Sequence, residues 1–373
     1  MSPVAPSSPP LLSEVSVLDL SIWRPGPYAT SLLVGLGADV VKIEPPGGDP
    51  MRHYPELFES VNAGKRSIML DLKEPDGAGR RRALELAAEA DVIVEGFRPG
   101  VIARLGLGET TIRALNAGVV FCSISGYGQQ GPLAVAPGHD LNYQAWAGAL
   151  APDGGAAVMP PLPLADLASG MTAAFGICAA LLGRGAGGPG TYLDISMTDV
   201  MATWTGSARS VSDEDPVAEV GSGAAGAGIG VGDGEVVSGS SRGVPGYGLF
   251  DTADGLQVAL GVVNEQHFWS ALCTELGLED LGGLTFSERL LRSEELAGAV
   301  TDAVGSRHRD DLVSSLLAAG VPAAPVLDRV GMVANGPFPG FPIRLGGASG
   351  PPPPPAPTLD QHRDQGFRRA RPG

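Results

Sequence analysis

Short apolar segments alternate with helical patterns along the first half of the chain. Residues 15–20 (VSVLDL) predict a strand, a turn rich in Pro and Gly follows at 21–27, and the apolar spacing over 28–36 predicts a helix. Residues 40–44 (VVKIE) predict a second buried strand, which completes a right-handed β-α-β unit. The first two predicted strands are therefore expected to lie parallel in one sheet.

The same alternation continues to residue 204. Further strands are predicted at 67–72, 92–95, 119–124 and 192–196, and further helices at 76–90, 141–150, 167–182 and 199–204. The helix at 167–182 is almost wholly apolar, so we expect it to be buried. We predict an α/β domain at 15–204 with a mostly parallel sheet covered on both faces, whose ligands bind beyond the carboxyl ends of the strands.

The composition changes after residue 204. Residues 205–246 are rich in Gly, Ser and Ala and contain no aromatic residue, so we expect a linker or mobile loop. A strand at 258–263 and helices near 267–275, 293–304 and 310–319 predict a smaller α/β domain at 247–327. We expect a disordered N-terminus at 1–14, and a proline-rich return and tail at 328–373 that wraps a neighbouring surface or frays.

Charge and composition limit the possible partners and compartments. The net charge of −16 opposes binding to nucleic acids or anionic membranes, so an anionic ligand must meet local positive charge. No stretch of about 18 uncharged apolar residues and no signal peptide occur, which predicts a cytoplasmic protein. Three widely spaced cysteines predict buried thiols and no disulfide, and neither a P-loop nor a metal-spaced cluster is present.

Two arginines follow the strand predicted at 92–95. Arg98 and Arg104 flank Pro99-Gly100 in the segment GFRPGVIARLG. Two guanidinium groups beyond a strand end could clamp phosphates in a bidentate manner. Solvated surface ion pairs are the alternative, because exposed arginine is the commoner case.

A histidine and an aspartate stand at the start of the helix predicted at 141–150. His139 and Asp140 would lie near positive backbone dipoles, which favour a neutral, basic imidazole. The alternative is that Asp140 is a simple N-cap and His139 a buried, hydrogen-bonded histidine.

Two further acids are candidates for chemistry. Asp166 lies between apolar neighbours just before a long apolar helix, where burial would raise its pKa and suit it to act as an acid, base or nucleophile. Glu265 follows the strand predicted at 258–263. Helix capping is the alternative role for both residues.

Several ordered motifs resemble those of the family III CoA-transferase and α-methylacyl-CoA racemase family, also called CaiB/BaiF. The motifs are DL with PGPY at 19–28, LGADVVKIE at 36–44, NAGKRSIMLDL at 62–72, FRPG at 97–100, SISGYGQQGP at 123–132 and GHDLNY at 138–143. The resemblance implies a large Rossmann-like domain, a small domain and an interlocked homodimer.

The resemblance also implies that coenzyme A binds as part of the substrate, with no tightly bound cofactor. The residues that match CoA-binding segments are Arg24, Pro25, Leu70, Asp71, Leu72, Lys73, Gly96, Phe97, Arg98, Arg104, Pro137, Gly138 and Asp140. The acyl group of the thioester would reach toward Asp166.

Two chemistries share this family. In the transferases, the acid that matches Asp166 forms a mixed anhydride and then an aspartyl-CoA thioester. In the racemases, the residues that match His139 and Asp166 exchange the α-proton from opposite faces, and an acid that matches Glu265 orients the histidine. The racemase-like GHDxNY motif is intact, and the Gly-run typical of transferases is replaced by residues 240–246. We therefore expect a 2-methylacyl-CoA racemase, with a CoA-transferase as the alternative.

Overall fold

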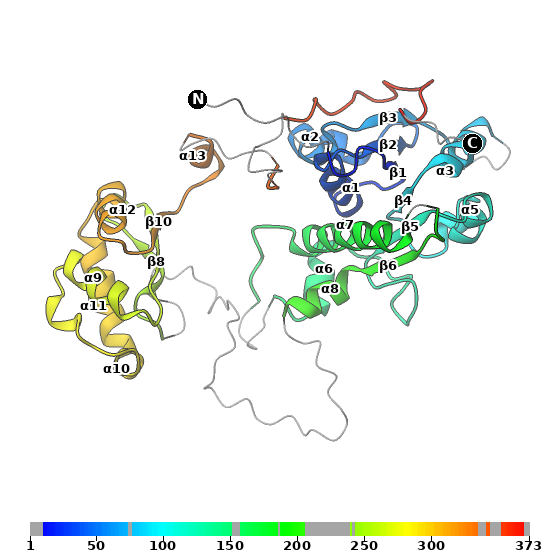
Figure 1. Cartoon of the computed structure of the whole chain (residues 1–373). Coiled ribbons are helices and arrows are strands. Elements are labelled where there is room, and N and C mark those ends of the chain that lie inside the picture. Colours follow the sequence, from blue (N-terminus) through cyan, green and yellow to red (C-terminus); the bar gives the residue numbers. More distant parts are fainter. Residues whose placement is uncertain are drawn as a thin grey trace, which may run out of the picture. The chain divides into compact units, whose positions relative to one another are not determined.

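The computed structural model describes residues 10–73, 77–150, 157–185, 187–205, 239–240, 243–334, 341–343 and 352–368. The described residues form two compact units (Figure 1). The larger unit falls within Met1–Pro152, Met159–Gly226 and Pro339–Gly373, and the smaller within Asp153–Val158 and Ala227–Phe338. Most of the predicted N-terminal segment and linker lie outside the described residues.

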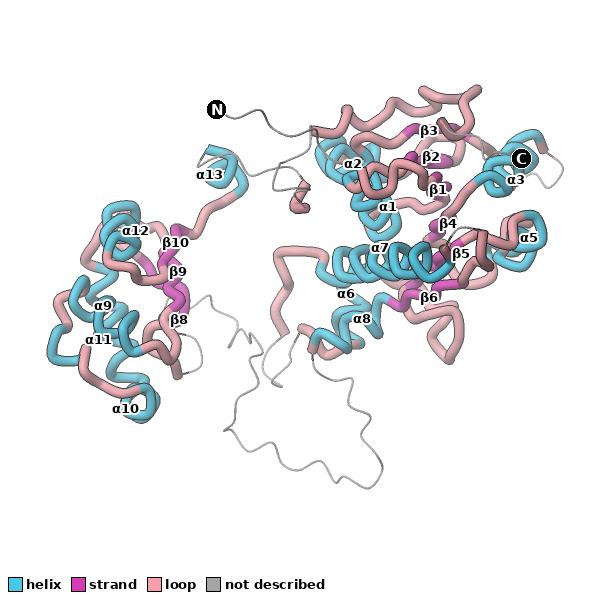
Figure 2. Tube along the Cα trace, in the orientation of Figure 1, coloured by secondary structure: helices cyan, strands magenta, loops and turns pink. Residues whose placement is uncertain are grey.

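The larger unit is built on a six-stranded parallel sheet with the order β3-β2-β1-β4-β5-β6 (Figure 2). Its strands are β1 (Ser16–Asp19), β2 (Asp39–Glu44), β3 (Arg66–Met69), β4 (Val92–Glu95), β5 (Val120–Ser125) and β6 (Tyr192–Ser196). Its helices are α1 (Pro25–Gly35), η1 (Pro50–His53), α2 (Pro55–Asn62), α3 (Ala78–Glu89), α4 (Val101–Arg104), α5 (Glu109–Leu115), α6 (Asp140–Trp146), α7 (Leu164–Arg184) and α8 (Met197–Trp204). The strand order reverses between β1 and β4, which makes this position the topological switch point. The predicted parallel α/β fold is confirmed.

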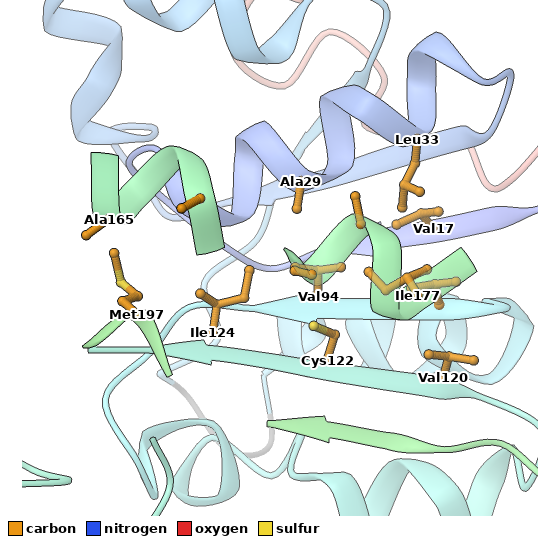
Figure 3. Close-up of a cluster of buried hydrophobic side chains, with 14 of the residues drawn as sticks. Val17, Ala29, Leu33, Val94, Val120, Cys122, Ile124, Ala165, Ile177 and Met197 are labelled. Carbon is orange, nitrogen blue, oxygen red and sulfur yellow. The ribbon is translucent and has the colours of Figure 1, made fainter. Parts of the chain in front are cut away.

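Helices cover both faces of the sheet because its strands are apolar on both sides. On one face, Val17 and Val94 pack with Ala29 and Leu33 of α1 and with α7 (Figure 3). On the other face, the neighbouring strand residue Leu18 packs with side chains of α3 and α5. Successive residues of β1 thus point into two separate cores.

Only one face of α7 is buried, so the prediction of a buried helix holds for that face alone. Its small residues, among them Ala168 and Ala173, are buried, whereas Met171, Phe175 and Leu182 are 50%, 75% and 85% exposed. The helix carries apolar side chains on all its faces, but only one of these faces packs against α1 and the sheet. Among the described residues, α7 alone is long and apolar enough to cross a membrane, a property that core helices share.

The C-terminal segment 352–368 packs on the larger unit beside β3. Its Asp360 carboxylate accepts a hydrogen bond from the Met69 amide at 2.9 Å, and the Ser67 amide donates to Nδ1 of His362 at 3.2 Å. Phe367 is buried in the core that contains α3. Residues 352–368 of the tail therefore lie against the larger unit.

The smaller unit pairs an antiparallel sheet, in the order β10-β9-β8-β7, with helices. Its strands are β7 (Gly239–Ser240), β8 (Tyr247–Asp251), β9 (Gln257–Gly261) and β10 (Ala323–Pro325). Its helices are α9 (Gln266–Glu275), η2 (Glu279–Leu281), α10 (Phe286–Leu291), α11 (Ser293–Gly305), α12 (Arg309–Ala318) and α13 (Arg329–Ala334). The unit begins earlier than predicted, because Gly239 and Ser240 pair with β8.

Candidate functional site

A cleft of about 820 Å³ opens in the larger unit where β1, β4 and β5 end. Its position is the switch point of the sheet, where doubly wound folds bind ligands. The ends of three strands and the loops after them contribute Ile22, Trp23, Arg24, Pro25, Gly96, Phe97, Arg98, Pro99, Ile124, Ser125 and Gly126. The first turn of α6 and the segment before it contribute Ala134, Ala136, Pro137, Gly138, His139, Asp140, Asn142 and Tyr143. The remaining lining residues are Met51, Tyr54, Leu57, Pro163, Asp166 and Met197.

The GHDxNY motif folds as a self-supporting turn at the start of α6. The Tyr143 ring packs so closely on Gly138 that a Cβ there would lie 2.7 Å from the ring, and its hydroxyl donates to the Gly138 carbonyl at 2.5 Å. The amide of His139 donates to the side-chain oxygen of Asn142 at 3.0 Å. The motif therefore fixes the backbone that presents the His139 imidazole to the cleft.

Asp166 lies in the first turn of α7 and borders the same cleft. Burial, reinforced by the nearby Asp140 carboxylate and opposed by Arg24, raises the pKa of Asp166 to about 7. A carboxyl group with this pKa exists in both protonation states near neutral pH, so it can accept or donate a proton. The predicted rise in its pKa is thus supported, and the cause includes a like charge as well as burial.

A buried ion pair beneath the cleft was not anticipated from the sequence. Lys42 and Asp49, both fully buried, approach to 2.9 Å, and the Lys42 ammonium also donates to the Ser21 carbonyl at 2.7 Å. The other oxygen of Asp49 accepts from the amides of Trp23 and Met51 at 3.3 and 2.9 Å. The lysine of the KIE motif therefore anchors two segments that line the cleft.

A second buried pair fixes the start of α1. Lys65 contacts Asp19 at 3.0 Å and donates to the Pro27 carbonyl at 2.9 Å. Burial alone would raise the pKa of Asp19, but Lys65, Lys42 and two hydroxyl groups hold it well below its ordinary value. The motifs at 19–28 and 62–72 thus meet in one ionic cluster below the loop after β1.

The candidate CoA-binding residues fall into two groups. Arg24, Pro25, Gly96, Phe97, Arg98, Pro137, Gly138 and Asp140 line the cleft, whereas Arg104 and the segment Leu70, Asp71, Leu72 and Lys73 do not. Neither Arg24 nor Arg98 forms an ion pair with any residue that the structure describes. Their guanidinium groups therefore have no carboxylate partner within the described part of the chain.

Glu265 belongs to the smaller unit and stands at the N-cap of α9. Its carboxylate accepts a hydrogen bond from the Val263 amide at 3.2 Å. The buried Arg289 donates to the carbonyls of Val263 and Asn264 at 2.9 and 3.2 Å, which fixes the turn before α9. Glu265 therefore occupies the N-cap position, but its carboxylate forms no capping hydrogen bond to α9.

The glycines of the loop after β5 belong to the segment SISGYGQQGP and form a further pattern. Gly126, Gly128 and Gly131 spell G-x-G-x-x-G directly after that strand. No helix begins there, so the loop lacks the helix N-terminus that holds a pyrophosphate in dinucleotide-binding folds. Within the described ranges, no group of His, Cys, Asp or Glu could hold a metal ion.

Comparison with known proteins identifies the family. The model of CoA-transferase family III matches residues 12–363. The chain is 31% identical to acetyl-CoA:oxalate CoA-transferase of Acetobacter aceti over 96% of its own length and 95% of that protein. It is 34% identical to human alpha-methylacyl-CoA racemase over 72% of its own length and 65% of that protein. A CAIB/BAIF family protein from Brucella suis matches 95% of the chain with a TM-score of 0.76 and 26% identity, and the match covers 97% of that structure.

Proposed function

The chain belongs to CoA-transferase family III, and from this premise we propose that it is a 2-methylacyl-CoA racemase. One observation carries the proposal: His139 and Asp166, two groups suited to proton transfer, line the same cleft of the larger unit. Asp166 has a pKa of about 7, which suits a residue that must both take up and release a proton near neutral pH.

The proposed reaction is a 1,1-proton transfer at the carbon next to the thioester carbonyl. The carbonyl acidifies the α-hydrogen because the electron pair left by the proton is delocalised into an enolate. One base, His139 or Asp166, removes the proton from one face, and the conjugate acid of the other returns a proton to the opposite face. Each proton transfer contributes roughly a hundred-fold or more to the rate.

Coenzyme A would enter as part of the substrate, not as a tightly bound cofactor. Arg24 and Arg98 line the cleft and would pair with its phosphates, because guanidinium groups bind phosphate oxygens in a bidentate manner. Arg104 and the segment from Leu70 to Lys73 would contribute only at the margin, since they do not line the cleft.

A CoA-transferase is the second candidate, and the relatives favour it. The relative from Acetobacter aceti, which matches nearly the whole chain, is named as a CoA-transferase. In that reaction the Asp166 carboxylate would attack the thioester carbonyl and expel the CoA thiolate. The thiolate would then attack the aspartyl carbonyl of the anhydride, release the acid and leave CoA on Asp166 for a second carboxylate.

We further propose a homodimer in which Glu265 of a second subunit orients His139. The exposed apolar side chains Met171, Phe175 and Leu182 of α7 support a partner surface on the larger unit, since such patches are rarely left in contact with water. Light scattering after size exclusion tests the stoichiometry, and a monomer would exclude this role for Glu265.

The deciding experiment follows the α-hydrogen by proton NMR. The protein is incubated in heavy water with one epimer of a 2-methylacyl-CoA and no added carboxylic acid. Loss of the α-hydrogen signal with formation of both epimers supports the racemase. No exchange, together with CoA transfer once a panel of carboxylates is added, assigns a transferase with Asp166 as nucleophile.

Variants connect the outcome to the residues. His139→Gln and Asp166→Asn should each lower epimerisation by at least about a hundred-fold while CoA affinity stays nearly unchanged. His308→Gln is a matched control, because His308 is an exposed histidine of the smaller unit. Activity close to wild type in both cleft variants would contradict the assignment of these bases.

A further inference from the structure

We propose that Trp23 is a specificity-determining residue that selects apolar acyl groups over acyl groups ending in a carboxylate. The inference rests on the proposed function, since it concerns the acyl moiety of the same thioester. It starts from the backbone of Trp23, whose φ of +63° lies in the left-handed region. Among the described residues, Asp360 is the only other non-glycine residue in this region. A residue with a Cβ adopts this conformation only when its surroundings impose it.

The surroundings of Trp23 impose its conformation through fully buried charges. Its amide donates to Oδ1 of Asp49 at 3.3 Å, and Oδ2 of Asp49 is held by Lys42 at 2.9 Å. Lys42 also donates to the carbonyl of Ser21, two residues before Trp23. Because a buried charge without its partner is costly, this network resists any rearrangement that would let Trp23 relax.

The conformation places a large aromatic ring beside the candidate base. The indole of Trp23 lies edge to face with the His139 imidazole, with 6.3 Å between ring centroids. Its side chain is 40% exposed and borders the cleft, so it is not simply part of the core. A group attached to the carbon that exchanges a proton with His139 would therefore meet this ring.

The wall around Trp23 is apolar. Asp49 joins the loop after β1 to η1, because the same Oδ1 accepts from the amides of Trp23 and Met51. Met51 lines the cleft together with Tyr54 and Leu57 from the same part of the chain. Met51 and Leu57 carry no polar group, and a carboxylate placed against them would lose water without gaining a partner.

Arg24, the residue after Trp23, offers the opposite possibility. Its guanidinium lies in the electrostatic field of Asp166 and could pair with the carboxylate end of a dicarboxylic acyl group. The two arrangements predict opposite preferences, so binding of unreactive substrate analogues separates them. The probes are S-decyl-CoA and S-(3-carboxypropyl)-CoA, two thioethers that the protein cannot turn over.

Titration calorimetry of the full chain with these probes tests the proposal. We expect the wild type to bind S-decyl-CoA at least tenfold more tightly than S-(3-carboxypropyl)-CoA. Trp23→Gly should reduce this preference by about tenfold or more, because burying an aromatic or long apolar group contributes at least that much. Affinity for free CoA should change by less than threefold. Glycine is chosen because it adopts positive φ without strain, so the loop is retained.

Two further variants keep the result interpretable. Trp23→Phe should keep most of the preference, and Trp204→Ala, which removes an exposed tryptophan of α8, should keep all of it. A thermal melt shows that each variant is folded. An unchanged preference in Trp23→Gly, or tighter binding of the carboxypropyl probe by the wild type, would overturn the proposal. Because the probes do not react, the test stands even if neither epimerisation nor CoA transfer is found.

Discussion

The backbone amide of Asp166 donates a hydrogen bond to Oδ1 of Asp140 at 3.0 Å, which joins the start of α7 to the start of α6. The other oxygen of Asp140 accepts from the Gln144 side chain at 2.6 Å. Asp140 directly follows His139, so one carboxylate ties together the two segments that carry the candidate bases. Its charge also acts on Asp166 and adds to the effect of burial on the pKa of that residue.

Replacing Asp140 with asparagine should therefore lower the pKa of Asp166. The asparagine would keep an oxygen for the Asp166 amide but remove the like charge, and Gln144 could turn its amide to pair with the new NH2 group. We expect the limb of the pH profile of epimerisation kcat/KM that reports Asp166 to move to lower pH. The profile is measured on both sides of neutrality.

Asp280→Asn provides the control, since Asp280 is an exposed acid in η2 of the smaller unit. Its profile should match that of the wild type. A profile of Asp140→Asn that moves to higher pH, or does not move, would show that Asp140 does not set the protonation of Asp166.

The ionic cluster under the cleft should dominate the stability of the larger unit. Asp19→Asn leaves the fully buried Lys65 without its carboxylate partner, which should lower the free energy of unfolding by about 3–5 kcal/mol. Adding Lys65→Met should recover part of this loss, because the uncompensated charge is then gone. Denaturant unfolding is measured for the wild type, the two single variants and the double variant, and losses that simply add would exclude coupling between the two residues.

The exposed pair Arg292–Glu295 is the matched control, and its loss through Arg292→Ala should leave stability nearly unchanged.

The contribution of Asp19 to the free energy of unfolding should depend on pH with a defined sign. Because the pKa of Asp19 is lowered in the folded state, its contribution is present above the ordinary value of 3.8 and disappears as the pH falls below it toward the folded-state value. The wild type and Asp19→Asn should therefore differ most near neutrality and least in strong acid.

The sequence predicted what depends on local pattern. The strands at 92–95 and 192–196 have the predicted limits: Gly96 follows the first strand, and the second ends where Ser196 caps α8. His139 and Asp166 were identified from their positions at helix starts, and they do line one cleft. The parallel sheet and its ligand crevice followed from the alternation of strands and helices.

The sequence could not predict what depends on contacts between distant segments. Nothing local marks Trp23 as left-handed, because its conformation is imposed by Asp49 and Lys42. Asp49 itself gave no signal, since acids in Gly/Pro-rich turns are usually solvated. The exposed face of α7 was missed for a related reason: apolar composition cannot tell which side of a helix meets the sheet. These are properties of tertiary packing.

Ionisation of the Glu95 carboxyl group should lower the free energy of unfolding of the larger unit as the pH rises. Burial, opposed by hydrogen bonds from Ser123 and the Phe97 amide and assisted by Asp194, raises the pKa of Glu95 from 4.5 to about 7. The folded state therefore binds the proton more tightly than the unfolded state, and the stability this gives is lost as the pH rises through about 4.5 to 7. Glu95→Gln cannot ionise and should lack this loss.

The measurement is the difference in Tm between Glu95→Gln and the wild type at several pH values. The difference should increase in favour of the variant between about pH 5 and about pH 8, by an amount equivalent to at most a few kcal/mol. Glutamine keeps an oxygen that accepts from the Phe97 amide, so the loop that carries Arg98 should remain in place. A difference that is constant with pH would mean that Glu95 does not titrate in this range.

The packing of α7 on α1 connects a glycine remote from the chemistry to the shape of the cleft. A Cβ on Gly170 would lie 2.7 Å from the Pro25 carbonyl oxygen and 2.8 Å from the Tyr28 ring, and Pro25 is both the first residue of α1 and part of the cleft lining. Gly170→Ala should therefore push the start of α1 away, lower the free energy of unfolding by about 1–3 kcal/mol and reduce kcat/KM.

Gly183→Ala in the same helix is the control. It has no atom within 4 Å of the new Cβ, so it should be neutral or stabilise the protein by up to about 1 kcal/mol. Denaturant unfolding and activity of the two variants give the comparison. Equal stability and activity would show that close contact at Gly170 does not position the loop after β1.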